Sequence, residues 1–164
     1  MKKLLFMMLM LAPMAAFAQK FGHVNTQEIM QAMPEVTKAR TDIEALAKQY
    51  EADLKQMQEE LQKKSEAYEK EQASLPANIK QRRETELQEM YQKIQQSYQD
   101  NQQALAKEQQ EKMQPIQTKV MDAIKAVGQA GGYVYIMEMG TQLYISSTLS
   151  TDVTKEVKAK LGLK

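Results

Sequence analysis

The sequence predicts a mainly α-helical protein with a small β body, in which a long antiparallel helical hairpin is inserted between strands from the two ends of the chain. Three observations predict this fold. Residues 35–129 contain no glycine before Gly128 and consist largely of strong helix formers. One helix-breaking cluster, residues 74–78 around Pro76, interrupts them. Short β-rich runs lie on both sides, at 21–25 and 133–146.

Residues 1–18 have the features of a secretory signal peptide. Lys2 and Lys3 precede the apolar run 4–11, and Ala16-Phe17-Ala18 is the small-x-small pattern that a signal peptidase cleaves. The apolar run is too short to span a bilayer as a helix. We therefore expect an exported protein that is cleaved after Ala18.

The composition argues against several classes of function. The chain has no cysteine, so neither disulfides nor thiol chemistry supports it. Without Lys2 and Lys3, the chain has 20 basic and 21 acidic side chains. This balance argues against nucleic-acid binding, which needs a basic surface. His23 is the single histidine and has no partner for a metal site, and no phosphate-binding glycine motif is present. We expect neither catalysis nor a cofactor nor a bound metal.

Residues 19–34 are predicted to form the first part of the body. The run from Phe21 to Asn25 is expected to be a short strand. Asn25 with Glu28 three residues later fits a variant of the capping box, which predicts a short helix through Met33. Pro34 is expected to end this helix and to open the next one, because a missing N–H costs nothing at the first helical position.

Residues 35–129 are predicted to form a helical arm with its turn near 75–77. The first helix repeats apolar residues every seven positions, which is typical of a narrow helix-on-helix seam. The returning helix repeats them every eleven positions. Because the two periods favour supercoils of opposite hand, we expect loose packing. The rows are Ala47, Leu54, Leu61, Tyr68 and Leu75 with Ile43, Tyr50 and Met57, and then Ile94, Leu105, Ile116 and Val127 with Tyr91, Met113 and Ile124.

Residues 130–164 are predicted to complete the body. The β-rich runs 133–139 and 142–146, joined through Gly140, are expected to form a β-hairpin. Thr154 is expected to cap a terminal helix that ends near Leu161. Three short strands and two short helices make a body that is too small to be stable alone, and its edge strands would be open. We therefore expect oligomerisation.

Together these features resemble the Skp (OmpH) family of periplasmic chaperones. The resemblance rests on the signal peptide, on the helical hairpin, and on the segments Phe21-Gly-His-Val-Asn25, Tyr144-Ile-Ser-Ser147 and Asp152-Val-Thr-Lys-Glu-Val157. It implies a periplasmic homotrimer whose three bodies join and whose arms surround a cavity for unfolded outer-membrane proteins. Such a protein is an ATP-independent holdase. The alternative is a structural coiled-coil spacer or adaptor of the cell envelope, although adaptors normally carry larger β-domains on both sides of the hairpin.

Two groups of arm residues are candidates for contact with partners. The first is basic and follows the turn, where it fits anionic lipid headgroups, lipopolysaccharide or acidic client segments, with plain solubilising charge as the alternative. The second consists of methionines and a tyrosine that are expected to face the cavity, because such side chains form adaptable apolar surface. The basic group is Lys80, Arg82 and Arg83, and the apolar group is Met90, Tyr98 and Met121.

Two prolines suggest a hinge in the arm. Pro34 lies 42 residues before Pro76 and Pro115 lies 39 residues after it, so the two are expected at nearly the same level of an antiparallel hairpin. Pro115 removes the hydrogen bond to the carbonyl of Glu111 and tends to kink its helix. We hypothesise that the arm bends at this level.

Overall fold

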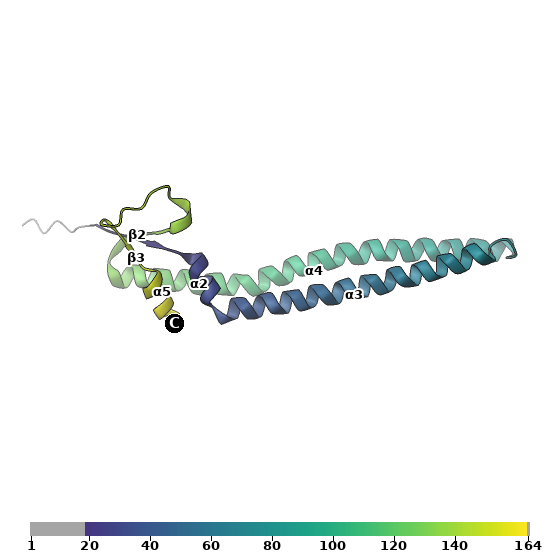
Figure 1. Ribbon diagram of the computed structural model, residues 1–164, viewed down its shortest axis with the longest axis horizontal. Coiled ribbons are helices and arrows are strands. Elements are labelled where there is room, and N and C mark those ends of the chain that lie inside the picture. The colour runs from purple at the N-terminus through teal and green to yellow at the C-terminus, as the bar shows by residue number, and fades with distance from the viewer. Residues whose placement is uncertain (1–18, 164) are drawn as a thin grey trace, which may run out of the picture. The chain divides into compact units, whose positions relative to one another are not determined.

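The computed structural model describes residues 19–163 (Figure 1). The signal peptide predicted for residues 1–18 therefore lies outside the described residues. The chain divides into two compact units. Residues 33–118 form the first, which we call the arm unit. The described residues before Met33 and after Thr118 form the second, the body unit.

The arm unit is a helical hairpin, as the sequence predicts. Helix α3 spans Pro34–Glu71, with Pro34 at its first turn, and helix α4 spans Ala77–Gly131. Residues 72–76, which connect the helices, include the predicted helix breaker Pro76. The two helices run side by side in opposite directions within the arm unit (Figure 1). The last turns of α4 belong to the body unit.

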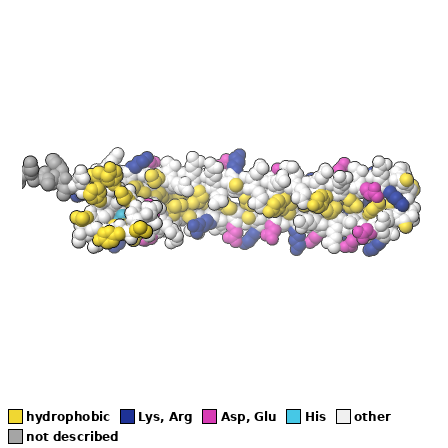
Figure 2. Space-filling view, turned by 90° about the horizontal axis from the view of Figure 1, so that it is seen from above, with side chains coloured by type: hydrophobic (Ala, Val, Ile, Leu, Met, Phe, Trp, Pro, Cys, Tyr) yellow, Lys and Arg dark blue, Asp and Glu magenta, His cyan; other side chains and the backbone are white. Residues whose placement is uncertain are grey.

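The seam of α3 follows the predicted seven-residue repeat. Figure 2 shows a line of hydrophobic side chains along the arm, with charged side chains to either side. The polar residue Lys64 continues this seam half-buried and forms an ion pair with Glu86 of α4. One row of half-buried residues alternates spacings of four and three positions, as expected for a narrow contact. They are Ile43, Ala47, Tyr50, Leu54, Met57, Leu61, Lys64 and Tyr68.

The prediction that Tyr91 lies in the seam of α4 is wrong. Tyr91 is 57% exposed, whereas its neighbour Met90 is half-buried. Ile94 and Ile116, both in the predicted eleven-residue row, are buried. Met90, four positions before Ile94, lies about 40° from it around the helix, whereas Tyr91, three positions before, lies about 60° away in the other direction. Tyr91 therefore belongs to the exposed surface of α4.

The body unit contains a three-stranded parallel sheet of order β2-β1-β3. Strand β1 spans Lys20–Val24 and pairs on one side with β2, Tyr133–Glu138, and on the other with β3, Ser150–Asp152. The predicted pairing of strands from the two ends of the chain is confirmed. A 3-10 turn, Met139–Thr141, follows β2.

The β-hairpin predicted for residues 133–146 is wrong. Residues 142–146 form no strand, and the third strand is β3. The two strands that follow α4 occupy opposite edges of β1 and run in the same direction. A chain that joins them must cross over instead of making the tight turn of a hairpin. Residues 139–149 make this crossover.

Two short helices complete the body unit. Helix α2 spans Thr26–Ala32, and the side-chain oxygen of Asn25 accepts the N–H of Glu28 at 2.9 Å, as the predicted cap requires. Helix α5 spans Thr154–Lys160. The prediction that Thr154 caps α5 is wrong, because Val153 holds the cap position and the N–H of Thr154 donates to Asp152 at 2.9 Å. The buried Thr154 hydroxyl instead accepts the N–H of Asn25 at 3.0 Å.

The core of the body unit is small and apolar. Ile29 of α2 and Val153 and Val157 at α5 are fully buried. Glycine brings α4 close to the sheet, since a Cβ atom at Gly128 would lie 3.2 Å from the side chain of Ile136. Gly132 ends α4 in the left-handed region, with φ of 66°, as expected for a residue that follows a helix.

Candidate functional site

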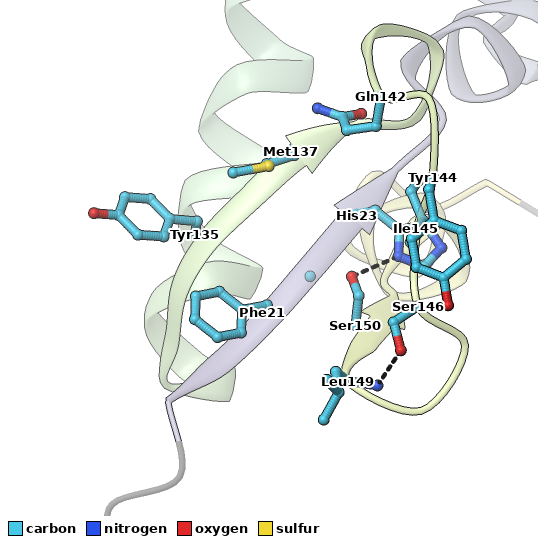
Figure 3. A pocket seen from close by; sticks show the side chains of 11 residues that line it. Phe21, His23, Tyr135, Met137, Gln142, Tyr144, Ile145, Ser146, Leu149 and Ser150 are labelled. Carbon is cyan, nitrogen blue, oxygen red and sulfur yellow. Dashed lines mark hydrogen bonds between the residues drawn. The ribbon is translucent and has the colours of Figure 1, made fainter.

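Among residues 19–163, one face of the sheet remains uncovered. Phe21 of β1 and Tyr135 and Met137 of β2 are 38%, 59% and 48% exposed. The rings of Phe21 and Tyr135 stack with centroids 6.3 Å apart and planes 8° from parallel (Figure 3). The alternate residues Gly22 and Ile136 lie on the side that packs against Gly128 of α4. Phe21, His23, Tyr135 and Met137 thus form what we call the open face.

The crossover segment adds further apolar groups to this surface. Leu143, Tyr144 and Leu149 are 108%, 82% and 76% exposed. The segment and the open face together line a hollow of about 230 Å³ (Figure 3). Contiguous exposed apolar surface of this kind marks an interaction site. The sequence did not predict this surface, because residues 142–146 were expected to form the second strand of a β-hairpin.

Two polar groups are placed within this hollow. The Nδ1 atom of His23 lies 2.8 Å from the hydroxyl oxygen of Ser150, which holds β1 against β3 (Figure 3). The Oε1 atom of Gln142 is buried and, among residues 19–163, has no hydrogen-bond donor. A buried acceptor without a donor costs free energy.

The predicted basic cluster lies in the first turns of α4 and is mixed with acidic groups. Arg82 is exposed, whereas Lys80 and Arg83 are half-buried. The Glu86 carboxylate beside them pairs with Lys64, whose hydrogen bond holds the pKa of Glu86 below its usual value, and Arg83 and Arg82 add smaller attractions. The surface after the turn is thus not uniformly positive.

The predicted apolar contact residues have different surroundings. Met90 is half-buried and lines a small hollow of about 150 Å³ with Met57 and Ile94, between the two helices of the arm. Tyr98 is 54% exposed on α4 in the arm unit. Met121 is 51% exposed and belongs to the body unit. Within one chain Met90 therefore contributes to the seam, while Tyr98 and Met121 are available at the surface.

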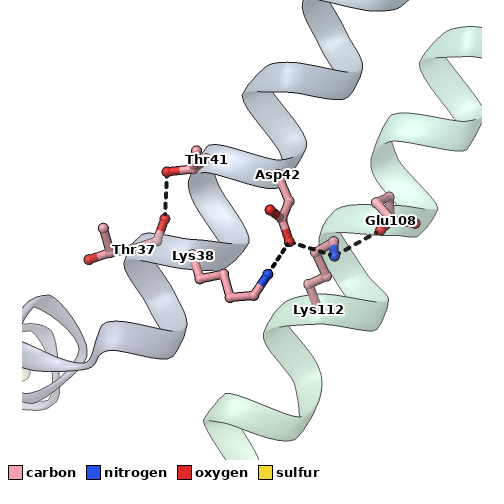
Figure 4. Close-up of polar contacts among 6 residues, drawn as sticks. All are labelled: Thr37, Lys38, Thr41, Asp42, Glu108 and Lys112. Atoms are coloured by element: carbon pink, nitrogen blue, oxygen red, sulfur yellow. Dashed lines mark hydrogen bonds and ion pairs between the residues drawn. The ribbon is translucent and has the colours of Figure 1, made fainter.

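An ion cluster joins α3 and α4 near the predicted proline pair. The Lys112 ammonium lies 3.1 Å from Asp42 of α3 and 3.2 Å from Glu108 of α4 (Figure 4). Lys38 also lies 3.4 Å from Asp42. Pro34 begins α3 and Pro115 lies within α4, one turn beyond Lys112. The cluster lies beside buried apolar residues of both helices, Ala39 of α3 and Ile116 of α4.

Acid is expected to weaken this cluster. The hydrogen bond from Lys112 is the main reason that the pKa of Asp42 lies below its ordinary value of 3.8, although partial desolvation opposes the shift. A lowered pKa in the folded state stabilises the fold above the unfolded pKa, and this contribution is lost as the pH falls through the folded pKa. Asp42→Asn should therefore lower the melting temperature at pH 7, and the difference from the unchanged protein should shrink below about pH 3.8.

Circular dichroism melting curves between pH 7 and pH 2 measure this effect. Asp53→Asn is the matched control, because Asp53 is an exposed aspartate of the same helix. The control should melt like the unchanged protein throughout the range. A difference between Asp42→Asn and the unchanged protein that stays constant down to pH 2 would show that the carboxylate charge does not stabilise the arm.

Two further properties of the described residues bear on function. Among the helices of residues 19–163, none combines the length and the hydropathy that a bilayer crossing requires. The same residues contain no cluster of three His, Cys, Asp or Glu side chains that could hold a metal ion.

Comparisons with known proteins identify the family. A search of curated proteins returned no match. A crystal structure of a candidate outer membrane chaperone (OmpH-like) from Caulobacter crescentus CB15 has a similar fold, with a TM-score of 0.76 at 14% identity over 87% of this chain and 83% of that one. The family model described as "Outer membrane protein (OmpH-like)" matches residues 20–161. Because this match covers most of the chain, the protein belongs to the OmpH-like family.

Proposed function

We propose that this protein is an ATP-independent periplasmic holdase chaperone that binds unfolded outer-membrane proteins between the helical arms of several copies. The OmpH-like family, with a structural relative described as a candidate outer membrane chaperone, supports a chaperone role. The observation that carries the proposal is the combination of a long helical hairpin with a small body whose sheet has an open apolar face.

The proposed working form is a homotrimer joined through its bodies. The open face and the crossover segment expose Tyr135, Leu143 and Leu149, which a second copy would cover. A neighbouring copy would also supply the donor that Gln142 lacks. Within the described residues, the edge strands β2 and β3 each have no partner on their outer side, so each can pair with another copy. Assembly would thus cover the exposed apolar side chains and pair the open sheet edges of the isolated body.

The proposed mechanism is capture by many weak contacts. Arms that surround one client can bind it at several points, so the overall affinity is high while each contact dissociates quickly. Exposed groups such as Tyr98 and Met121 adapt to clients without a fixed shape. No nucleotide-binding motif is present in the sequence. Release is therefore assigned to the client, which leaves for a site where it can fold.

The basic residues after the turn form a proposed second contact. We propose that Lys80, Arg82 and Arg83 contact lipopolysaccharide, other anionic lipids or acidic client segments. Glu86 lies among them and reduces their attraction to anions. We therefore propose a weak and salt-sensitive contact at this end of the arm.

Light scattering tests the proposed function. An outer-membrane barrel protein that is unfolded in urea aggregates on dilution into buffer. The chain from residue 19 onward should prevent scattering when its assemblies are equimolar with the barrel protein. A structural spacer or adaptor of the envelope, the alternative function, would leave the scattering unchanged.

The proline pair is proposed as a hinge that adapts the arms to the size of the client. Replacing Pro115 with alanine restores the backbone donor and removes the clash with the preceding turn, so α4 should stiffen. Spin labels at the turns of the arms should then report a narrower distribution of arm-to-arm distances than in the unchanged protein. An unchanged distribution would contradict the hinge.

A further inference from the structure

The charges of α4 between residues 88 and 117 gather on one stripe. Glu89, Lys93, Asp100, Lys107 and Glu111 follow one another at spacings of four or seven residues, which places them on one side of a helix. The other charged residues of this stretch are Glu108 and Lys112, and both take part in the ion cluster with Asp42. The side of α4 opposite the stripe therefore carries no charge over eight turns, roughly 45 Å.

Glutamine and tyrosine side chains lie on this uncharged side. We call this surface the glutamine–tyrosine face and define it by Gln88, Tyr91, Gln95, Tyr98, Gln102 and Gln109. All six side chains are exposed, and Tyr91 and Tyr98, one heptad apart, are 57% and 54% exposed. Among the described residues, none of the six side chains forms a hydrogen bond.

The exposed surface of α3 is different. It carries charges of both signs, and several of them pair along the helix, such as Lys48 with Glu44 at 2.8 Å and Lys55 with Glu59 at 3.9 Å. Helix surfaces that only contact solvent normally carry such mixed charges, which keep proteins apart. The two helices of one arm thus present unlike surfaces, and the uncharged one requires an explanation beyond solubility.

The chemistry of the glutamine–tyrosine face matches an extended polypeptide. A glutamine side chain both donates and accepts hydrogen bonds, and an unfolded main chain offers unpaired N–H and C=O groups of both kinds. Because the amides are uncharged, they neither attract nor repel a client according to the sign of its charge. Gln109 and Gln110 border a shallow groove with Met113, so apolar client groups also find contact there.

We propose that the glutamine–tyrosine face is the side of the arm that contacts the client. Its occupant is an unfolded, extended polypeptide held by side-chain amides through hydrogen bonds to its main chain and by Tyr91 and Tyr98 through their rings. This inference rests on the proposed holdase function and assigns the contact surface of that function to one helix. Recognition of the main chain makes binding independent of the client sequence.

Charge placed on the face tests the proposal. The triple variant Gln95→Glu, Gln102→Glu, Gln109→Glu should bind a urea-diluted outer-membrane barrel about tenfold more weakly, because three donors are lost. The matched control carries Gln49→Glu, Gln56→Glu and Gln58→Glu on the exposed surface of α3 and should bind like the unchanged protein. Glutamine and glutamate have similar helix propensities, so both variants should keep their helices.

Comparing variants of opposite charge distinguishes main-chain recognition from electrostatic attraction between the arm and the client. Lysine at positions 95, 102 and 109 removes the acceptors and should also weaken binding of the same barrel. If glutamate weakens binding while lysine strengthens it, or if the α3 control loses as much affinity as the α4 variant, the proposal is overturned.

Cross-linking locates the client directly. The chain has no cysteine, so Gln102→Cys and Gln56→Cys each provide a single attachment point for a photoreactive group. Position 102 should cross-link to the unfolded barrel and position 56 should not. Cross-linking of position 102 to a second copy in the absence of client would assign the face to assembly and overturn the proposal.

The outcomes also separate this inference from the function on which it rests. If the unchanged protein prevents aggregation and the α4 variants do so equally well, the assigned face is wrong and the holdase function stands. If the unchanged protein fails to prevent aggregation, both proposals fall.

Discussion

Replacing Leu143 and Leu149 together with glutamate is expected to convert the proposed trimer into single subunits. Both side chains are largely exposed in the single chain, at 108% and 76%, so the change removes almost no packing within it. In the proposed trimer they would be covered, and two carboxylates would have to leave water. Association should weaken by about a hundredfold or more. Sedimentation equilibrium of the chain from residue 19 onward measures this directly.

The control for this prediction carries the same added charge elsewhere. Ala45 and Ala52 are exposed on α3, so Ala45→Glu with Ala52→Glu should leave the assembly intact. Circular dichroism should show that both variants retain their helices. If the unchanged protein sediments as one subunit, or if the Leu143 and Leu149 variant stays assembled, the role given to the open face and crossover segment is wrong.

The second large effect is expected in the body core. Ile29 of α2 is fully buried and α2 packs against α5, where Val157 is also fully buried. Ile29→Ala leaves a cavity in a core with few other residues to fill it. The free energy of unfolding should fall by about 3 kcal/mol. Urea unfolding followed by circular dichroism measures it. One fixed protein concentration is used, because association of the proposed trimer would contribute to the apparent stability.

Gln31→Ala is the matched control for Ile29→Ala. Gln31 lies on the same helix and is exposed, so its truncation should change the free energy of unfolding by less than about 0.5 kcal/mol. A loss below about 1 kcal/mol for Ile29→Ala would mean that the contact between α2 and α5 contributes little to folding.

The arm could be predicted well because its signals are local. Helix propensity, the seven-residue repeat and the cluster around Pro76 all depend on residues close together in the chain. They predicted α3, α4 and the turn between them. The error at Tyr91 arose because apolar character alone cannot show which of two adjacent residues, Met90 or Tyr91, enters the seam.

The body was harder to predict because its contacts join distant residues. The β-rich run 142–146 follows β2 closely, and a hairpin is the simplest local pairing. The fold instead places β3 beside β1, where His23 contacts Ser150. Likewise Thr154 fits a local capping rule, yet its hydroxyl bonds to Asn25, 129 residues away. The open face depends on these long-range pairings, so the sequence did not predict it.

The sequence by itself determined the helical hairpin, the strands β1 and β2 that flank it, the cap at Asn25 and the absence of cysteine chemistry, because each depends on neighbouring residues or on composition. The tertiary structure alone decided the order of the sheet, the exposure of Tyr135, Leu143 and Leu149, and the ion cluster around Lys112. These features depend on which distant segments meet, and that choice is made by the free energy of the whole fold.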